Sequence, residues 1–453
     1  MRGSQKSQLI GRLACAGMLV PALLSAQGTT QTAPAPTAPF AFADFTWLNG
    51  NSRQHTSVLD TKYFTGEFRL DATYILDFNR PADHTLVGTS ESGRTSEVQV
   101  QQLGIGGDFH AGVARGRLMT QFGMYSTMTP RNDASPGRGQ WSLDNAYRYI
   151  SEAYGGIHLN KMHGINIDAG IFMSYVGLFS YYNYDNWAYQ PSYVSSNTPW
   201  FFNGIRLQFF PSDKLKLEPW LINGWQSYGM FNSTPGFGLQ VLWRPTGSLS
   251  ILSNSYYGRD WLGLPDRWRV HSDNSLQVKY HDRPTAAIRR GAFSLTVDAG
   301  CEGGAGVSCT GGTDPAQYFL GFMLYNRLWL ASDKLAITAG GGAMTNPGRY
   351  LVLMPPINGA TAFSGAPGYF TYNPGDQFKA WDASIGFDYM PDEFVTVRAE
   401  FDHRHASVPY FAGQGGVTPL GGNTGAPGST VAGFTPDLRQ TENRINLALL
   451  VKL

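Results

Sequence analysis

Residues 67–78 read Glu-Phe-Arg-Leu-Asp-Ala-Thr-Tyr-Ile-Leu-Asp-Phe. From Phe68 onward every second side chain is apolar, and the side chains between them are polar except for Ile75. A period of two over this length predicts a β-strand with one apolar and one polar face. Such a strand exceeds the usual length of about 5 to 6 residues in soluble sheets and matches the roughly 9 to 11 that cross a bilayer when tilted.

The same alternation recurs along most of the chain. It is found at 165–171, 205–209, 237–243, 276–280, 318–324, 381–389, 395–401 and 445–453. Beyond the N-terminus, no stretch approaches the roughly 18 to 20 consecutive apolar residues of a membrane helix. If the protein enters a membrane, it therefore does so with strands.

The connections between these segments alternate in length. Seven short turns are expected at 108–112, 160–164, 211–214, 245–247, 281–290, 331–334 and 391–393, and eight long loops at 79–96, 126–146, 174–200, 223–235, 258–267, 300–314, 343–376 and 405–441. This pattern predicts an all-β, transmembrane, antiparallel up-and-down barrel of about 16 strands, with short periplasmic turns and long extracellular loops. An even strand count places both termini on the periplasmic side. A secreted propeller or sandwich is the alternative, but its periodic blade motifs are missing from the sequence.

The N-terminus predicts export. Arg2, Lys6 and Arg12 precede an apolar stretch at 13–24 and a small-residue cleavage site, so residues 1–26 are expected to be a signal peptide. Residues 27–62 are expected to be a periplasmic Pro/Thr/Ala linker and N-terminal segment, and residues 63–453 the outer-membrane barrel.

Composition excludes several classes of protein. Only 15% of the 453 residues are charged, against about 25% in soluble domains, and 34 Lys and Arg nearly balance 33 Asp and Glu. A nucleic-acid binder concentrates positive charge, which this chain does not. The sequence contains no Gly-x-Ser-x-Gly elbow, His-Glu-x-x-His zinc helix or P-loop. We therefore expect no enzyme activity, no cofactor and no metal site.

The chain also resembles a known family, the OmpL-like outer-membrane β-barrel porins. The resemblance covers nearly the whole mature chain and rests on Phe78–Pro81, Glu152–Tyr154, Gly170–Phe172, Tyr175–Gly177, Ser180–Tyr182, Asn186–Trp187, Ser196–Trp200, Lys214–Leu217, Asn223–Trp225, His403–His405 and Pro409–Phe411. It implies an outer-membrane barrel with a passive pore, and it does not imply a particular solute.

A barrel of about 16 strands is too wide for side chains to fill, so inward positions should be polar and surround water. The candidate pore-lining residues are Glu67, Arg69, Asp71, Asp77, Arg115, Arg117, Arg398, Glu400 and Asp402. Both signs of charge are present, which predicts local transverse fields in the lumen. The alternative role for these charges is to pair across the lumen and stabilise the barrel.

The loop at 174–200 is unusually aromatic and carries almost no charge beyond Asp185. Its candidate constriction residues are Tyr175, Phe179, Tyr181, Tyr182, Tyr184, Trp187 and Tyr189. Such a loop is too apolar to remain solvated, and folding into the barrel would bury it and narrow the pore. Alternatively, its ends extend the flanking strands and supply the aromatic girdle at the bilayer surface.

Two cysteines remain in the mature chain, Cys301 and Cys309. Their flexible spacer and the oxidising compartment favour a disulfide in an external loop over a metal site.

Together these patterns predict an outer-membrane porin for passive diffusion of small hydrophilic solutes. The alternatives are an adhesin or structural barrel without an open pore, or a hydrolase at the barrel rim. The expected partners are outer-membrane lipids and lipopolysaccharide, the barrel-assembly machinery and small polar solutes, with homo-oligomerisation left open.

Overall fold

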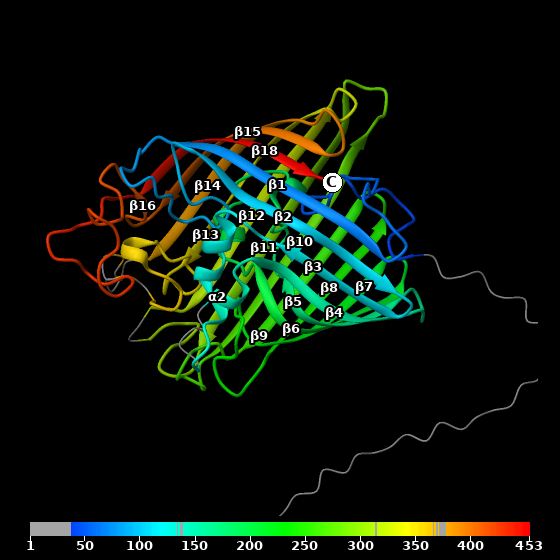
Figure 1. Ribbon diagram of the computed structural model, residues 1–453. Coiled ribbons are helices and arrows are strands. Elements are labelled where there is room, and N and C mark those ends of the chain that lie inside the picture. The colour runs from blue at the N-terminus through cyan, green and yellow to red at the C-terminus, as the bar shows by residue number, and fades with distance from the viewer. Residues whose placement is uncertain are drawn as a thin grey trace, which may run out of the picture. The chain divides into compact units, whose positions relative to one another are not determined.

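Sixteen antiparallel strands form a closed barrel in the computed structural model of the chain (Figure 1). The structure describes residues 38–453, except 134, 136–138, 313–314, 366, 368–369 and 371–376, so the expected signal peptide and residues 27–37 lie outside it. The strands are β1 Phe64–Asp77, β2 Val98–Ala111, β3 Ala114–Thr120, β4 Ile150–Leu159, β5 Ile165–Met173, β6 Phe201–Ser212, β7 Leu215–Ile222, β8 Gly236–Thr246, β9 Leu249–Gly258, β10 Trp268–Asp282, β11 Ile288–Gly303, β12 Tyr318–Leu330, β13 Leu335–Asn346, β14 Phe378–Tyr389, β15 Val395–Ala406 and β18 Thr441–Lys452. The predicted all-β barrel of about 16 strands is confirmed.

The barrel is apolar outside and polar inside, the reverse of a soluble domain. On β15 the outward side chains of Val397 and Phe401 are exposed, whereas Arg398, Glu400 and Asp402 are buried. The period of two in the sequence therefore sorts apolar groups to the outer surface and charged groups to the interior.

Connections alternate in length, as expected. Short turns join β2–β3, β4–β5, β6–β7, β8–β9, β10–β11, β12–β13 and β14–β15, and long loops make the other eight connections. The turn expected at 108–112 lies instead at Gly112 and Val113, because Asp108–Ala111 continue to pair with β3.

Secondary structure outside the barrel wall lies in the long loops and is short. It comprises α1 Tyr125–Met128, α2 Leu143–Tyr147, α3 Tyr193–Ser196, the 3-10 turns η1 Pro130–Asn132, η2 Asn183–Asp185 and η3 Ile357–Gly359, and a two-stranded sheet of β16 Phe411–Ala412 and β17 Leu438–Arg439. None of the helices in the described residues has the length and apolar character to cross a membrane.

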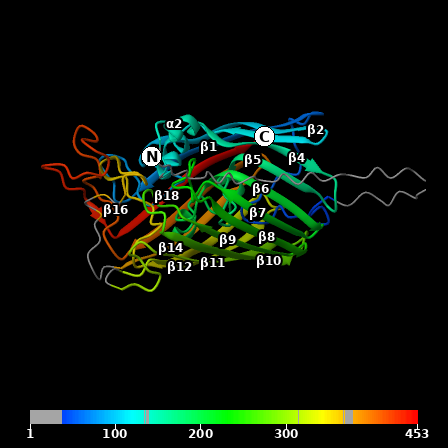
Figure 2. The same cartoon turned by 90° about the horizontal axis from the view of Figure 1, so that it is seen from below.

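The first and last wall strands close the barrel. β1 pairs with β18 from Arg69 opposite Lys452 to Asp77 opposite Arg444, and β18 pairs with β15 on its other side. Figure 2 shows β1 and β18 side by side along the wall. The two strands that close the barrel are thus the first and the last of its wall, and nearly the whole barrel sequence separates them.

The N-terminal segment, defined here as residues 38–62, lies across the short-turn end of the barrel. Its contacts are spread around the rim: the Phe40 N–H donates to the Asp213 carbonyl (2.7 Å), Trp47 Nε1 to the Gly247 carbonyl (3.0 Å) and Gln54 Nε2 to the Lys452 carbonyl (2.8 Å). The expected linker region is therefore packed against the barrel over these residues, because the closed rim supplies acceptors that an isolated peptide lacks.

Candidate functional site

The nine candidate pore-lining residues lie on three wall strands and form two groups. In the first group, Arg117 on β3 contacts Glu67 on β1 (3.0 Å), Asp108 on β2 (2.8 Å) and Glu152 on β4 (3.0 Å). Glu67 also pairs with Arg69, and Arg115 lies 3.5 Å from Asp168. In this part of the lumen, charges of opposite sign lie next to one another on neighbouring strands.

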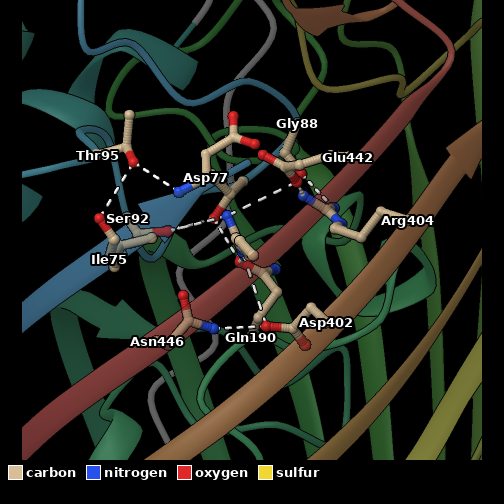
Figure 3. A network of polar contacts seen from close by, with 12 residues as sticks. Ile75, Asp77, Gly88, Ser92, Thr95, Gln190, Asp402, Arg404, Glu442 and Asn446 are labelled. Atoms are coloured by element: carbon tan, nitrogen blue, oxygen red, sulfur yellow. Dashed lines mark hydrogen bonds and ion pairs between the residues drawn. The ribbon is translucent and has the colours of Figure 1, made fainter. Parts of the chain in front are cut away.

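The second group lies where β15, β18 and β1 meet (Figure 3). Asn446 Nδ2 donates to Asp402 (2.5 Å), and Arg404 lies 3.5 Å from Glu442. The Asp77 N–H donates to Thr95 Oγ1 (2.8 Å), which ties the β1–β2 loop to the wall. Arg444 extends from β18 to the side chain of Gln190. This group therefore joins the wall to the loop between β5 and β6.

That loop, residues 174–200, folds into the lumen. All seven candidate aromatic side chains are buried, and none is more than 7% exposed. Burial raises the pKa of the Tyr181, Tyr182 and Tyr189 hydroxyls well above their ordinary values, so these groups remain neutral hydrogen-bond donors.

Carboxylates on the opposite wall hold the loop through its backbone. The N–H groups of Tyr189 and Gln190 donate to the two oxygens of Glu400, each at 2.7 Å. Asp382 on β14 accepts from the Ser192 hydroxyl (2.7 Å) and the Tyr193 N–H (2.9 Å). These contacts fix the second half of the loop to β14 and β15.

The first half of the loop is held to β1 and β4. Asn183 Nδ2 donates to Asp71 (2.9 Å), Asp185 pairs with Arg69 (3.0 Å), and the Tyr182 hydroxyl donates to Glu152 (2.7 Å). The loop thus crosses the lumen between walls formed by distant parts of the sequence.

The N-terminal segment meets this loop inside the barrel. Asn49 Oδ1 accepts from the Trp187 N–H (2.7 Å), and the Gly50 N–H donates to the Asp185 carbonyl (3.1 Å). Two cavities, of about 250 Å³ and about 320 Å³, border this contact. No sequence pattern predicted this contact, since Asn49 and Gly50 belong to no periodic segment.

A third cavity, of about 380 Å³, lies among the long loops. Trp225, Trp261, Asn197 and Arg269 are among the residues that line it. It is a mixed aromatic and polar vestibule at the end of the barrel opposite the N-terminal segment.

The two cysteines form a disulfide in the structure. Cys301 lies near the end of β11 and Cys309 in the following loop, with their Cα atoms 5.2 Å apart. Among the residues that the structure describes, no group of three or more His, Cys, Asp or Glu side chains has an arrangement that could hold a metal ion.

Comparison with known proteins gives one family match. The profile of the family described as "Putative beta-barrel porin-2, OmpL-like" matches residues 64–434. No curated protein matches the chain. Similar solved structures include OmpT of Vibrio cholerae, with 11% identity, 88% of this chain and 100% of that chain covered, and a TM-score of 0.47. The outer-membrane channel DcaP of Acinetobacter baumannii is 12% identical, with 86% of this chain and 96% of that chain covered and a TM-score of 0.46. OprB of Pseudomonas putida is 11% identical, with 86% of this chain and 94% of that chain covered and a TM-score of 0.47.

Proposed function

The chain belongs to the OmpL-like putative beta-barrel porin-2 family, and from this premise we propose that it forms a water-filled outer-membrane channel for passive diffusion of small hydrophilic solutes. The observation that carries the proposal is the sorting of charge in the wall, as on β15, where charged side chains face inward and apolar side chains face outward. Polar groups placed inside a barrel stabilise water and polar solutes there, and the apolar exterior suits lipid.

The loop at 174–200 is proposed as the constriction of this channel. Its anchors on β1, β4, β14 and β15 support a fixed position across the lumen. Its neutral tyrosine hydroxyls and aromatic rings would favour uncharged solutes with hydroxyl groups or rings, because the rings stack and the hydroxyls hydrogen-bond.

The short-turn end is proposed to face the periplasm and the long loops the exterior. Short periplasmic turns are the rule in barrels of this kind, and the arrangement puts residue 38 and Leu453 on the periplasmic side. Labelling intact cells with a membrane-impermeant thiol reagent tests this orientation. A cysteine introduced at Leu420, in the β15–β18 loop, should react, and one introduced at Arg283, in a short turn, should not.

Single-channel recording in planar bilayers tests the channel itself. The purified protein, folded in detergent, should give discrete conductance steps in potassium chloride. One observation favours the alternative of a structural barrel without an open pore, namely that the N-terminal segment and the constriction loop meet inside the lumen. Correctly folded protein that inserts but gives no conductance steps would support that alternative and refute the channel.

A further inference from the structure

The N-terminal segment reaches into the lumen with residues 45–50, Phe-Thr-Trp-Leu-Asn-Gly. Trp47, Leu48 and Asn49 are at most 2% exposed, whereas all the residues at 56–61 in the same segment are exposed. The buried stretch carries no charge and belongs to no strand. It is therefore an insertion of uncharged groups into a lumen whose wall carries charged side chains.

One side of this stretch is held by the wall at β8–β10. The Gln277 side chain on β10 clamps the backbone of Asn49, because its Oε1 accepts the Asn49 N–H (2.9 Å) and its Nε2 donates to the Asn49 carbonyl (3.4 Å). Trp47 Nε1 donates to the Gly247 carbonyl in the turn between β8 and β9 (3.0 Å). The stretch thus occupies the part of the lumen next to these three strands.

The other side of the stretch is held by the loop at 174–200. The two segments are joined by hydrogen bonds at Trp187 and Asp185. The Asp185 carboxylate in turn pairs with Arg69 on β1 (3.0 Å). Around the closed barrel, β10 lies seven strands from β1 in one direction and nine in the other. A continuous chain of contacts therefore joins nearly opposite walls, and residues 45–50 form its half next to β10.

Gly50 is the closest approach between the stretch and the loop. Its φ is +78°, a conformation that favours glycine, and a Cβ at this position would overlap the Leu178 carbonyl oxygen. A larger residue at position 50 would therefore push the two segments apart.

Two separate cavities remain beside this crossing. The cavity of about 250 Å³ is bordered by Leu48 and reaches β12, β14 and β15, whereas the cavity of about 320 Å³ is bordered by Asn49 and Gly50 and reaches β7–β10. Because residues 45–50 border both cavities, their removal would join the two spaces.

We propose that residues 45–50 are a plug that forms the second half of the constriction and closes the β8–β10 side of the lumen. The loop at 174–200 closes the side next to β1. Uncharged groups in a narrow passage exclude ions, because they do not replace the water that an ion loses on entering. The inference rests on the proposed channel function and assigns the narrowing of the channel to two segments.

Single-channel recording in planar bilayers tests the plug, with purified protein folded in detergent. Replacing residues 45–50 with a Gly/Ser linker of the same length should raise the conductance in potassium chloride by at least about twofold, because the two cavities become one water-filled passage. The same linker at 56–61 is the matched control, since it replaces exposed residues of the same segment. The control should conduct like wild type.

Gly50→Ala is a second variant that keeps the other side chains of the plug and disturbs its contact with the loop. It should also raise the conductance. Its control is Gly112→Ala in the β2–β3 turn, where φ is +61° and the added Cβ would meet no neighbouring atom within 4 Å. This control should conduct like wild type, since it carries similar backbone strain without the overlap.

Retained resistance to unfolding by heat in detergent verifies that each variant forms the barrel. Wild-type conductance in the folded linker variant overturns the proposal; if that variant does not fold, wild-type conductance in Gly50→Ala overturns it. A wild type without conductance whose linker variant conducts supports the plug and refutes the proposed passive channel. Equal conductance in both refutes only the plug, and absence of conductance in both folded proteins refutes the plug and the channel together.

Discussion

Replacing Glu400 with alanine should loosen the loop at 174–200 without opening the barrel wall. Glu400 accepts two backbone N–H groups, those of Tyr189 and Gln190, each at 2.7 Å. A hydrogen bond to a charged group contributes about 1.5 to 3 kcal/mol, so the loss of both amounts to about 3 to 6 kcal/mol. Each 1.4 kcal/mol is a factor of about ten in an equilibrium, so local opening should become at least about 100-fold more frequent.

Hydrogen exchange followed by mass spectrometry measures this change directly, on peptides that cover residues 187–192. Glu218→Ala is the matched control, because Glu218 is equally buried but accepts its hydrogen bonds from Gln208, Lys216 and Trp220 on β6 and β7. Exchange should accelerate in Glu400→Ala only. Unchanged protection in a folded Glu400→Ala protein would show that the carboxylate does not hold the loop.

Three further outcomes are expected. Replacing the stretch from Phe179 to Tyr189 with a short Gly/Ser linker should raise single-channel conductance, and unchanged conductance in a folded barrel would place the loop outside the current path. Alkylation of unreduced protein should label neither Cys301 nor Cys309 in mass spectrometry, whereas full labelling would exclude the disulfide. Burial raises the pKa of Asp133 from 3.8 to about 6, so its stabilising contribution of about 3 kcal/mol is complete below pH 3.8 and is lost as the pH rises through 6. The protection of amides in the β3–β4 loop, taken as the exchange rate relative to the intrinsic base-catalysed rate at each pH, should therefore fall from pH 4 to 7. Asp133→Asn should make this protection independent of pH, and an unaltered profile would contradict the assignment.

The wall of the barrel was predictable because its signal is local. Alternation such as that at 381–389 reports which face of a strand is apolar and points outward from the barrel, and it needs no knowledge of the neighbouring strands. Nine segments showed this alternation, and the seven short and eight long connections supplied the strand count and the up-and-down order. The end points were less exact where polar residues such as Asp108 continue a strand past its apolar residues.

The contents of the lumen were only partly predictable. The aromatic excess at 174–200 marked the loop, but the hydrogen-bond partners of Asn49 and Trp47 lie at least 138 positions away in sequence. Such contacts exist only once the wall is closed, so no local pattern encodes them. Arg53 likewise donates to the carbonyls of Asp392 and Val395, which lie 339 and 342 positions away in sequence.

The pairing of β1 with β18 also has a consequence for biogenesis. The seam joins the two ends of the barrel sequence, so the ring is sealed only after the last strand has been delivered. Until then one edge of β1 and one edge of β18 have no partner strand, and such exposed edges can pair with strands of other chains. Contacts of such sequence separation make folding slow, because the entropy of closing a long loop is lost before the contacts form. The contacts that the loop at 174–200 makes to both β1 and β15 can therefore be complete only after that slow final step.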